Sequence, residues 1–417
     1  MKNFVLLLTF ILSLQLSYAQ HPTCDGTRYL DTVFTTVDTF IGVQFGINTT
    51  IAGASDTLLM DIYQPQGDLA TNRPLIILAF GGSFILGERQ DLGELCYNYA
   101  RQGYVAATID YRLYDGPLFP IPDSTVIADE VMKAVSDMKA SIRFFREDAA
   151  TSNLYKIDSN IIFIGGGSAG AVTADHVAYL DPNDNIPAYV QTAINNNGGF
   201  HGNTTTNIQY STEVSGVLNF SGGLQRAGWI NSGEAPLFSA HDDGDGIVPY
   251  EQGYATAGPF DLIYMEGSKI MHDSALVANV QSQLITVPNS TGHVSYQSAG
   301  SPFRDSVFLG SSQFMHDIIC PTITSFEPIA SENNPYTALA YPNPSQGDMY
   351  IQVSELPSNY ALTAFDQTGR LVYQKENINQ QETVLYQQDF AAGLYFVRIQ
   401  FEDTTIPPIT TKVIFQK

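Results

Sequence analysis

The chain has 417 residues, of which 44% are hydrophobic and 15% are charged, and its formal net charge is −23. This length allows more than one domain, and the apolar content is sufficient for a substantial core, which excludes a disordered chain. Nucleic acid is not an expected partner, because binding to phosphates needs a basic surface. We attribute the acidity to solubility outside the cell rather than to steering of a substrate.

The N-terminus has the pattern of a secretory signal peptide. Lys2 is followed by an apolar run over residues 4–14 and by small residues at Ser17 and Ala19. We therefore predict a signal peptide over residues 1–19, cleaved after Ala19. The apolar run is too short to span a bilayer of about 30 Å, and no later stretch offers about 18 consecutive apolar residues. The mature chain is predicted to have no transmembrane segment.

Strand and helix patterns alternate through most of the mature chain. Apolar and polar residues alternate over residues 29–47 and 56–63, which indicates antiparallel strands. Residues 161–164 form a short unbroken apolar run, typical of a buried parallel strand. Further strands are predicted at residues 74–80, 104–111, 214–220, 236–240 and 283–287. Helical patterns occupy residues 92–102, 124–147, 169–179, 268–283 and 301–319. This alternation predicts an α/β fold over residues 20–321, with a doubly wound, mostly parallel sheet covered on both faces.

Three further stretches differ from this pattern. Residues 181–212 are polar and rich in Asn, Thr and Gly, and we predict a long loop with a functional role there. Residues 322–337 carry Pro and Asn and are predicted to be a linker. In residues 338–417, short alternating strands separated by turn residues predict a small all-β sandwich domain without a catalytic cluster of its own.

The chain has three cysteines, Cys24, Cys96 and Cys320. The oxidising compartment implied by a signal peptide permits one disulfide and leaves one thiol over. The sequence leaves the pairing open. We expect neither a cofactor nor a bound metal.

The segment around Ser168 is the first candidate for chemistry. Residues 166–170 read Gly-Gly-Ser-Ala-Gly and fit the G-x-S-x-G motif between the predicted strand 161–164 and the predicted helix 169–179. Such a turn is too tight for side chains two residues before and after the serine, and it raises the hydroxyl at the N-terminus of the helix. This context predicts that Ser168 is a nucleophile rather than part of an ordinary Gly-rich turn.

A serine hydroxyl needs a base, and the base needs an acid that orients it. In this fold the partners are expected after later strands, in the order Ser, Asp, His. Asp242, Asp243 and Asp245 lie in the acidic turn after strand 236–240, and each has suitable chemistry. The Asp/Gly alternation also resembles a calcium loop but lacks that loop's downstream Glu. His293 follows strand 283–287 in a Gly-containing loop and is the predicted general base.

The other histidines receive different interpretations. His176, His272 and His316 lie within predicted helices and are interpreted as structural. His241 lies at a strand end beside the acidic turn and is predicted to support the acid.

An oxyanion hole needs backbone N–H donors from two places. The residue after the nucleophile, Ala169, supplies one of them. The glycine-rich loop after strand 74–80 supplies the other through Gly82 and Ser83, where small side chains let the backbone approach the substrate carbonyl.

Together these motifs resemble the α/β-hydrolase carboxylesterases, which include feruloyl esterases, carboxylesterases and relatives of hormone-sensitive lipase. The motifs that carry the resemblance are Phe80–Phe84 with Gly87, residues 110–112, 166–170, 241–249 and 292–293. The family pattern His-Gly-x-x-Asp-x-x-Val-Pro aligns its acid with Asp245, which implies the triad Ser168, His293 and Asp245. Two residues depart from the family: Phe80 replaces the usual histidine before the Gly-Gly pair, and Asp242 replaces the glycine after His241.

The C-terminal region resembles the sorting domain of proteins exported by the type IX secretion system. Residues 341–344, 366–372 and 393–397 match the recurrent blocks of such domains. This resemblance implies export through the periplasm to the cell surface or the medium, with the secretion machinery as a partner.

The predicted function is that of a secreted serine hydrolase that cleaves carboxylic esters through an acyl-enzyme intermediate. One alternative keeps the same site but hydrolyses peptide bonds, as prolyl-oligopeptidase relatives do. Another is a non-catalytic surface adhesin or binding protein on a hydrolase scaffold.

Overall fold

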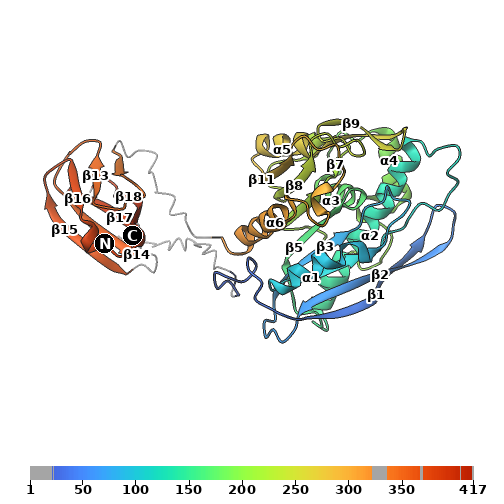
Figure 1. Cartoon of the computed structure of the whole chain (residues 1–417), viewed down its shortest axis with the longest axis horizontal. Coiled ribbons are helices and arrows are strands. Elements are labelled where there is room, and N and C mark those ends of the chain that lie inside the picture. The colour runs from blue at the N-terminus through green and yellow to red at the C-terminus, as the bar shows by residue number, and fades with distance from the viewer. Residues whose placement is uncertain (1–20, 22, 322–335, 367–369, 404, 416–417) are drawn as a thin grey trace, which may run out of the picture. The chain divides into compact units, whose positions relative to one another are not determined.

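The structure, a computed structural model, describes residues 21, 23–321, 336–366, 370–403 and 405–415. The chain forms two compact units, Met1–Pro321 and Thr322–Lys417 (Figure 1). The predicted signal peptide and residues 322–335 of the predicted linker lie outside the described residues. None of the helices in the described ranges combines the length and the apolar character needed to cross a membrane.

The first unit contains an eight-stranded sheet in the order β1-β2-β4-β3-β5-β6-β8-β11. The strands are β1 (Val37–Thr49), β2 (Ser55–Pro65), β3 (Arg73–Ala79), β4 (Val105–Ile109), β5 (Ile157–Gly167), β6 (Gly216–Phe220), β8 (Leu237–Asp242) and β11 (Ser282–Val287). β1, β2 and β4 pair antiparallel, and all pairs from β4 to β11 are parallel. Every residue of β3, β4, β6 and β8 is buried, which agrees with the buried strands predicted at residues 74–80, 214–220 and 236–240.

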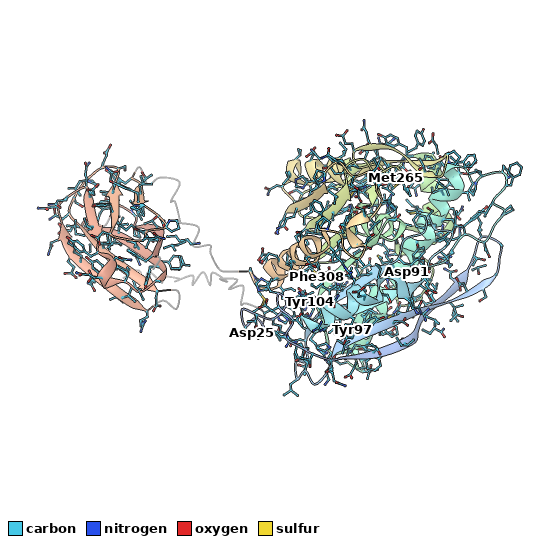
Figure 2. All side chains as sticks on the ribbon, viewed as in Figure 1. Asp25, Asp91, Tyr97, Tyr104, Met265 and Phe308 are labelled. Carbon is cyan, nitrogen blue, oxygen red and sulfur yellow. A yellow bond between two sulfur atoms is a disulfide. The ribbon has the colours of Figure 1, made fainter. Side chains whose placement is uncertain are left out.

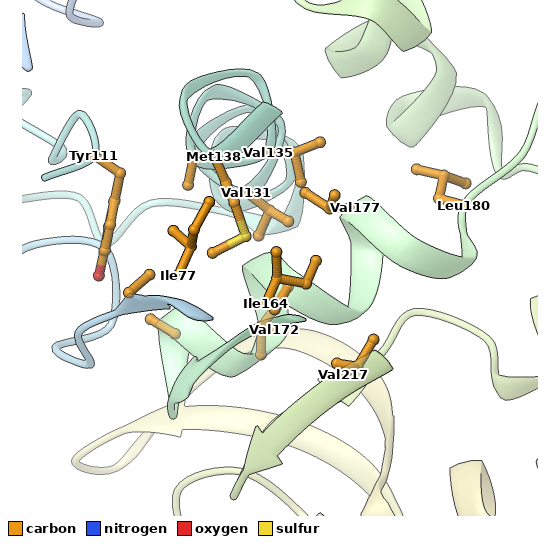
Figure 3. Close-up of a cluster of buried hydrophobic side chains, with 14 of the residues drawn as sticks. Ile77, Tyr111, Val131, Val135, Met138, Ile164, Val172, Val177, Leu180 and Val217 are labelled. Atoms are coloured by element: carbon orange, nitrogen blue, oxygen red, sulfur yellow. The ribbon is translucent and has the colours of Figure 1, made fainter. Parts of the chain in front are cut away.

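Helices cover both faces of this sheet, and alternate residues of β3 show how the core is divided. Leu75 and Ile77 join a cluster with α2 (Ser124–Ala150) and α3 (Ala169–Tyr179), which Figure 3 shows between these helices and the sheet. Ile76 and Leu78 join a second cluster with α1 (Gly93–Arg101) and α6 (Arg304–Ile319). Tyr104 and Phe308, labelled in Figure 2, pack in this second cluster. The predicted fold class, a mostly parallel sheet between helices, is confirmed.

One helix and one β-hairpin were not predicted. Helix α4 (Ala188–Asn196) lies within the segment expected to be a loop, because Val190, Ala193 and Ile194 form a short apolar stripe that is buried in the α2 cluster. A hairpin of β9 (Gln252–Ala257) and β10 (Phe260–Gly267) joins β7 (Gly223–Leu224) in a separate antiparallel sheet. The hairpin follows the acidic turn and precedes α5 (Ser268–Val277).

A disulfide joins Cys24 to Cys320, and Cys96 is buried as a free thiol. The bond links the start of the described first unit to the residue after α6. It therefore closes a loop with a sequence separation of 296 residues.

Loss of this disulfide should destabilise the first unit. The double variant Cys24→Ser/Cys320→Ser is expected to lose about 2–5 kcal/mol of unfolding free energy, because a long closed loop restricts the unfolded chain. Urea unfolding with and without reductant measures the effect. The wild type should weaken in reductant, and the double variant should not respond. Equal stability of the two proteins under oxidising conditions would contradict the expectation.

The second unit is all-β. One sheet has the order β12-β13-β16 and the other β15-β14-β17-β18. The strands are β12 (Ala338–Tyr341), β13 (Met349–Val353), β14 (Tyr360–Asp366), β15 (Leu371–Ile378), β16 (Glu382–Leu385), β17 (Gly393–Phe401) and β18 (Ile409–Phe415). Alternate residues such as Leu362, Val397 and Val413 form a separate buried core. This arrangement agrees with the predicted β-sandwich.

Candidate active site

Ser168 occupies a strained turn between β5 and α3. Its backbone φ of 52° and ψ of −119° lie in a region that residues other than glycine rarely adopt. Its backbone N–H donates a hydrogen bond of 2.8 Å to the carbonyl of Phe220, the last residue of β6. The neighbouring strand therefore holds the turn in place, at the carboxyl edge of the sheet.

The glycines around Ser168 are required by close backbone contacts. A Cβ on Gly166 would lie 2.3 Å from the carbonyl oxygen of Ala79, and a Cβ on Gly170 would lie 2.0 Å from the same oxygen. Side chains at these positions would push β3 away from the turn. The G-x-S-x-G spacing thus has a direct steric cause in this fold.

His293 lies between Ser168 and Asp245. Its Nε2 is 2.7 Å from Ser168 Oγ, and its Nδ1 is 2.6 Å from Asp245 Oδ2. The acidic turn follows β8 and the histidine loop follows β11, and these two strands are parallel neighbours. Their carboxyl ends therefore meet at one edge of the sheet, and the structure brings the three predicted triad residues together.

Asp245 is held as a carboxylate by several donors. Oδ1 accepts the N–H groups of Ile247 at 2.8 Å and Val248 at 3.2 Å, and Oδ2 lies 3.2 Å from His241 Nε2. Burial alone would raise the pKa of Asp245, but the hydrogen bonds from His241 and His293 outweigh burial and lower the pKa to about 2. The group is therefore an anion at neutral pH, which is what an imidazolium beside it needs.

The two ring nitrogens of His241 have different hydrogen-bond partners. Nδ1 lies 2.7 Å from the hydroxyl of Ser268, and Nε2 lies 3.1 Å from the carbonyl oxygen of Val248. Nε2 faces oxygen acceptors from Val248 and Asp245, so it carries the hydrogen, and Nδ1 accepts from Ser268. His241 thus lies where it can support the Asp245 carboxylate, which is the role that the sequence predicted for it.

The other two aspartates of the acidic turn bind the histidine loop. Asp243 accepts the N–H groups of Asn289 at 2.9 Å and Ser290 at 3.1 Å. Asp242 accepts the N–H of Ser295 at 3.0 Å and also the Ser295 hydroxyl. These bonds hold the loop on both sides of His293. Asp242, which stands where the family has a glycine, therefore has a hydrogen-bond partner in this chain, Ser295.

The predicted oxyanion loop follows β3. Gly82 has a φ of 126°, and a Cβ there would lie 1.9 Å from the carbonyl oxygen of Leu86, so this position requires glycine. Ser83 also has a positive φ, 55°. Phe80, the departure from the family histidine, stacks on Tyr111 with ring centroids 4.4 Å apart, and the Tyr111 hydroxyl donates to the Phe80 carbonyl at 3.0 Å. Aromatic packing thus holds the start of this loop.

The remaining helical histidines have local partners. His176 is buried, its Nδ1 is 2.8 Å from the Val172 carbonyl, and its Nε2 accepts the N–H of Gln225 at 3.3 Å. Burial lowers the pKa of His176 to about 4, so the ring is neutral at pH 7. His272 Nδ1 lies 2.8 Å from the Ser282 hydroxyl, and His316 lies beside Asp317.

A mainly apolar cavity begins at Ser168. Ser83 and Ala169 also line it. Its walls come from α2, α3, α4, the acidic turn and the β9–β10 hairpin. They include Ile127, Ala128, Val131, Met132, Val172, His176, Val190, Gln225, Ile247, Val248, Ala255, Thr256, Leu262, Ile263 and Met265. The sequence did not predict this cavity, because two of its walls are the elements that pattern reasoning missed. Among the described residues, no group of three His, Cys, Asp or Glu side chains is arranged to hold a metal ion.

Comparisons with known proteins agree with this architecture. The family model BD-FAE, an esterase-like α/β-hydrolase domain, matches residues 60–225. The model described as a secretion system C-terminal sorting domain matches residues 339–416. These matches confirm both predicted resemblances and the predicted class of enzyme, a carboxylic ester hydrolase. The sorting domain also confirms the predicted export by the type IX system to the cell surface or the medium.

Similar solved structures include esterase 2 of the planctomycete Thermogutta terrifontis. Its apo form is 17% identical and has a TM-score of 0.47, and the match covers 67% of this chain and 97% of that chain. The form phosphorylated by paraoxon is 18% identical with a TM-score of 0.48, and the match covers 66% and 95%. No curated protein sequence matches the chain.

Proposed function

We propose that this chain, which carries an esterase-like α/β-hydrolase domain and a type IX secretion sorting domain, is an exported serine esterase with the triad Ser168, His293 and Asp245. The observation that supports this most directly is the continuous hydrogen-bonded path from Ser168 Oγ through both ring nitrogens of His293 to Asp245. That geometry suits a nucleophile, a general base and an acid that orients the base.

The acylation step follows from these positions. Ser168 Oγ attacks the ester carbonyl carbon as its proton passes to His293 Nε2. Negative charge develops on the carbonyl oxygen, and the N–H groups of Ala169 and of Gly82 and Ser83 stabilise it. The bond to the alcohol oxygen then breaks, and the alcohol leaves with the proton from His293 Nε2. The acyl group remains bonded to Ser168 Oγ.

Water completes the cycle. His293 Nε2 takes a proton from a water molecule as the water oxygen attacks the acyl carbon. The tetrahedral intermediate collapses, Ser168 Oγ regains the proton, and the carboxylic acid leaves. Throughout these steps the Asp245 carboxylate accepts a hydrogen bond from the Nδ1–H group of His293 and stabilises the positively charged ring.

Two measurements test this proposal. The purified protein should hydrolyse p-nitrophenyl esters, and a fluorophosphonate probe should label it at Ser168, as peptide mass mapping would show. An adhesin would do neither. A peptidase would bind the probe but would cleave peptide substrates in preference to esters. Absence of both labelling and ester hydrolysis would refute the proposal.

We further propose the following domain organisation: a signal peptide over residues 1–19, a catalytic domain over 20–321, a linker over 322–337 and a sorting domain over 338–417. The candidate site lies wholly in the first compact unit. The second unit has its own buried core, so it does not depend on the hydrolase for its packing.

Removal of residues 338–417 should therefore separate catalysis from export. The truncated enzyme, purified and assayed on a soluble ester, is expected to keep its kcat within about twofold, because the candidate site lies in the first unit and each unit has its own buried core. In the native host it should accumulate in the periplasm, which fractionation would show. A large loss of kcat in the purified truncated enzyme would contradict the independence of the units.

A further inference from the structure

We infer that the cavity beside Ser168 receives the acyl group of the ester and that it selects uncharged, apolar acyl groups. This inference rests on the proposed function and names the substrate class for the same site. It depends on which residues line the cavity, on the lack of Asp, Glu, Lys and Arg side chains among the lining residues, and on the elements that close it.

The cavity lies on the acyl side of the reacting bond. Ser168, Ala169 and Ser83 line it, whereas His293 is not among its lining residues. The acyl carbon stays bonded to Ser168 through the intermediate, so its chain needs space next to that hydroxyl. The alcohol must reach His293 Nε2 to take its proton and then depart. The His293 side chain is 18% exposed, which leaves the alcohol a route to solvent.

The walls offer a charged acyl group no counterion. The described lining contains no Asp, Glu, Lys or Arg. Its one titratable ring, His176, is neutral at pH 7, and both of its nitrogens are already bonded to the Val172 carbonyl and the Gln225 N–H. A carboxylate or ammonium on the acyl chain would lose its water without gaining a partner, whereas an apolar chain gains by burial.

Two elements set the size of the cavity. Helix α2 contributes Ala128 and Met132, and the β9–β10 hairpin contributes Ala255 and Met265, the latter labelled in Figure 2. Ala128 and Met265 are 2% and 3% exposed, so substitutions there act on the enclosed space and not on the outer surface. Tyr254 also belongs to β9 but is 53% exposed and does not line the cavity.

These residues provide a matched set of variants. Ala128→Phe fills the cavity, Met265→Ala enlarges it, and Tyr254→Ala changes the same hairpin on its exposed side. We would measure kcat/KM for p-nitrophenyl acetate, butyrate, hexanoate and octanoate. We would add p-nitrophenyl hydrogen succinate, whose acyl group has the length of butyrate but carries a carboxylate. A series of acetate esters with longer alcohols tests the opposite side.

The wild type should prefer butyrate to hydrogen succinate by roughly 100-fold, because the charge is buried unpaired. Ala128→Phe should lower the hexanoate-to-acetate ratio of kcat/KM at least about tenfold, and Met265→Ala should raise the octanoate-to-acetate ratio by a similar factor. Tyr254→Ala should leave both ratios unchanged, and none of the variants should alter the preference among alcohols.

Equal rates on butyrate and hydrogen succinate would overturn the inference while the proposed function stands. So would a cavity variant that shifts the preference among alcohols instead of acyl groups. If Ala128→Phe fails to fold, as its melting temperature would show, Met265→Ala alone decides the assignment to the acyl side. If the wild type hydrolyses no ester of either series, the proposed function and the inference both fall.

Discussion

Replacement of Ser168 by alanine is expected to reduce kcat for ester hydrolysis by about 10⁶-fold, the loss found when a triad nucleophile is removed. The variant has no oxygen at the position 2.7 Å from His293 Nε2, so no acyl-enzyme can form. The fold should be preserved, because alanine keeps the Cβ and the turn is held by the backbone bond to Phe220. Steady-state assays of p-nitrophenyl butyrate hydrolysis measure this loss of kcat.

His293→Ala serves as the matched control. It removes the base and leaves the nucleophile, so it should also be inactive by a comparable factor, since triad residues act as a unit. Both variants should melt within a few degrees of the wild type. Near wild-type hydrolysis by Ser168→Ala would place the nucleophile elsewhere. Inactivation by His272→Ala with an active His293→Ala would show that the base has been assigned to the wrong loop.

The sequence was sufficient to predict the sheet and the place of Ser168 because both depend on local patterns. The apolar run of β5, the Gly-x-Ser-x-Gly turn and the small residues of α3 are contiguous. His293 and Asp245 are far from Ser168 in the chain, yet their positions were predictable, because parallel strands place their carboxyl ends at one edge. The order of strands in the sheet was therefore sufficient to predict that the three residues of the proposed triad lie close together.

The elements around the site were harder to predict. Helix α4 has its apolar stripe inside a polar, Asn-rich stretch, and β9 alternates weakly around Gly253. Helix α4 packs against α2 and β9 pairs with β10, and no local period reveals these tertiary contacts. The pairing of Cys24 with Cys320 likewise depends on where the chain ends meet. The cavity walls, and with them the substrate class, therefore required the three-dimensional structure.

The acidic turn provides the second large expected effect. Asp242, Asp243 and Asp245 carry the same charge within four residues, but only Asp245 contacts the ring of His293 among the described interactions. If general negative potential stabilised the imidazolium, each Asp→Asn variant would lower kcat by a similar, modest factor. If a specific acceptor is needed, Asp245→Asn alone should lower kcat by roughly 10⁴-fold, because an amide nitrogen facing Nδ1 favours the wrong tautomer.

The hydrogen bonds predict a distinct result for the other two positions. Asp242 and Asp243 each accept two donors from the histidine loop, and the amide oxygen of an asparagine can keep one of them. Asp242→Asn and Asp243→Asn should therefore lower the melting temperature and cost about tenfold or less in kcat, through a looser His293. Asp245→Asn should keep much of its stability, since the N–H groups of Ile247 and Val248 still find an oxygen. A collapse of kcat in Asp243→Asn with an active Asp245→Asn would transfer the role of the acid to Asp243, and equal mild losses at all three positions would favour bulk charge over a specific bond.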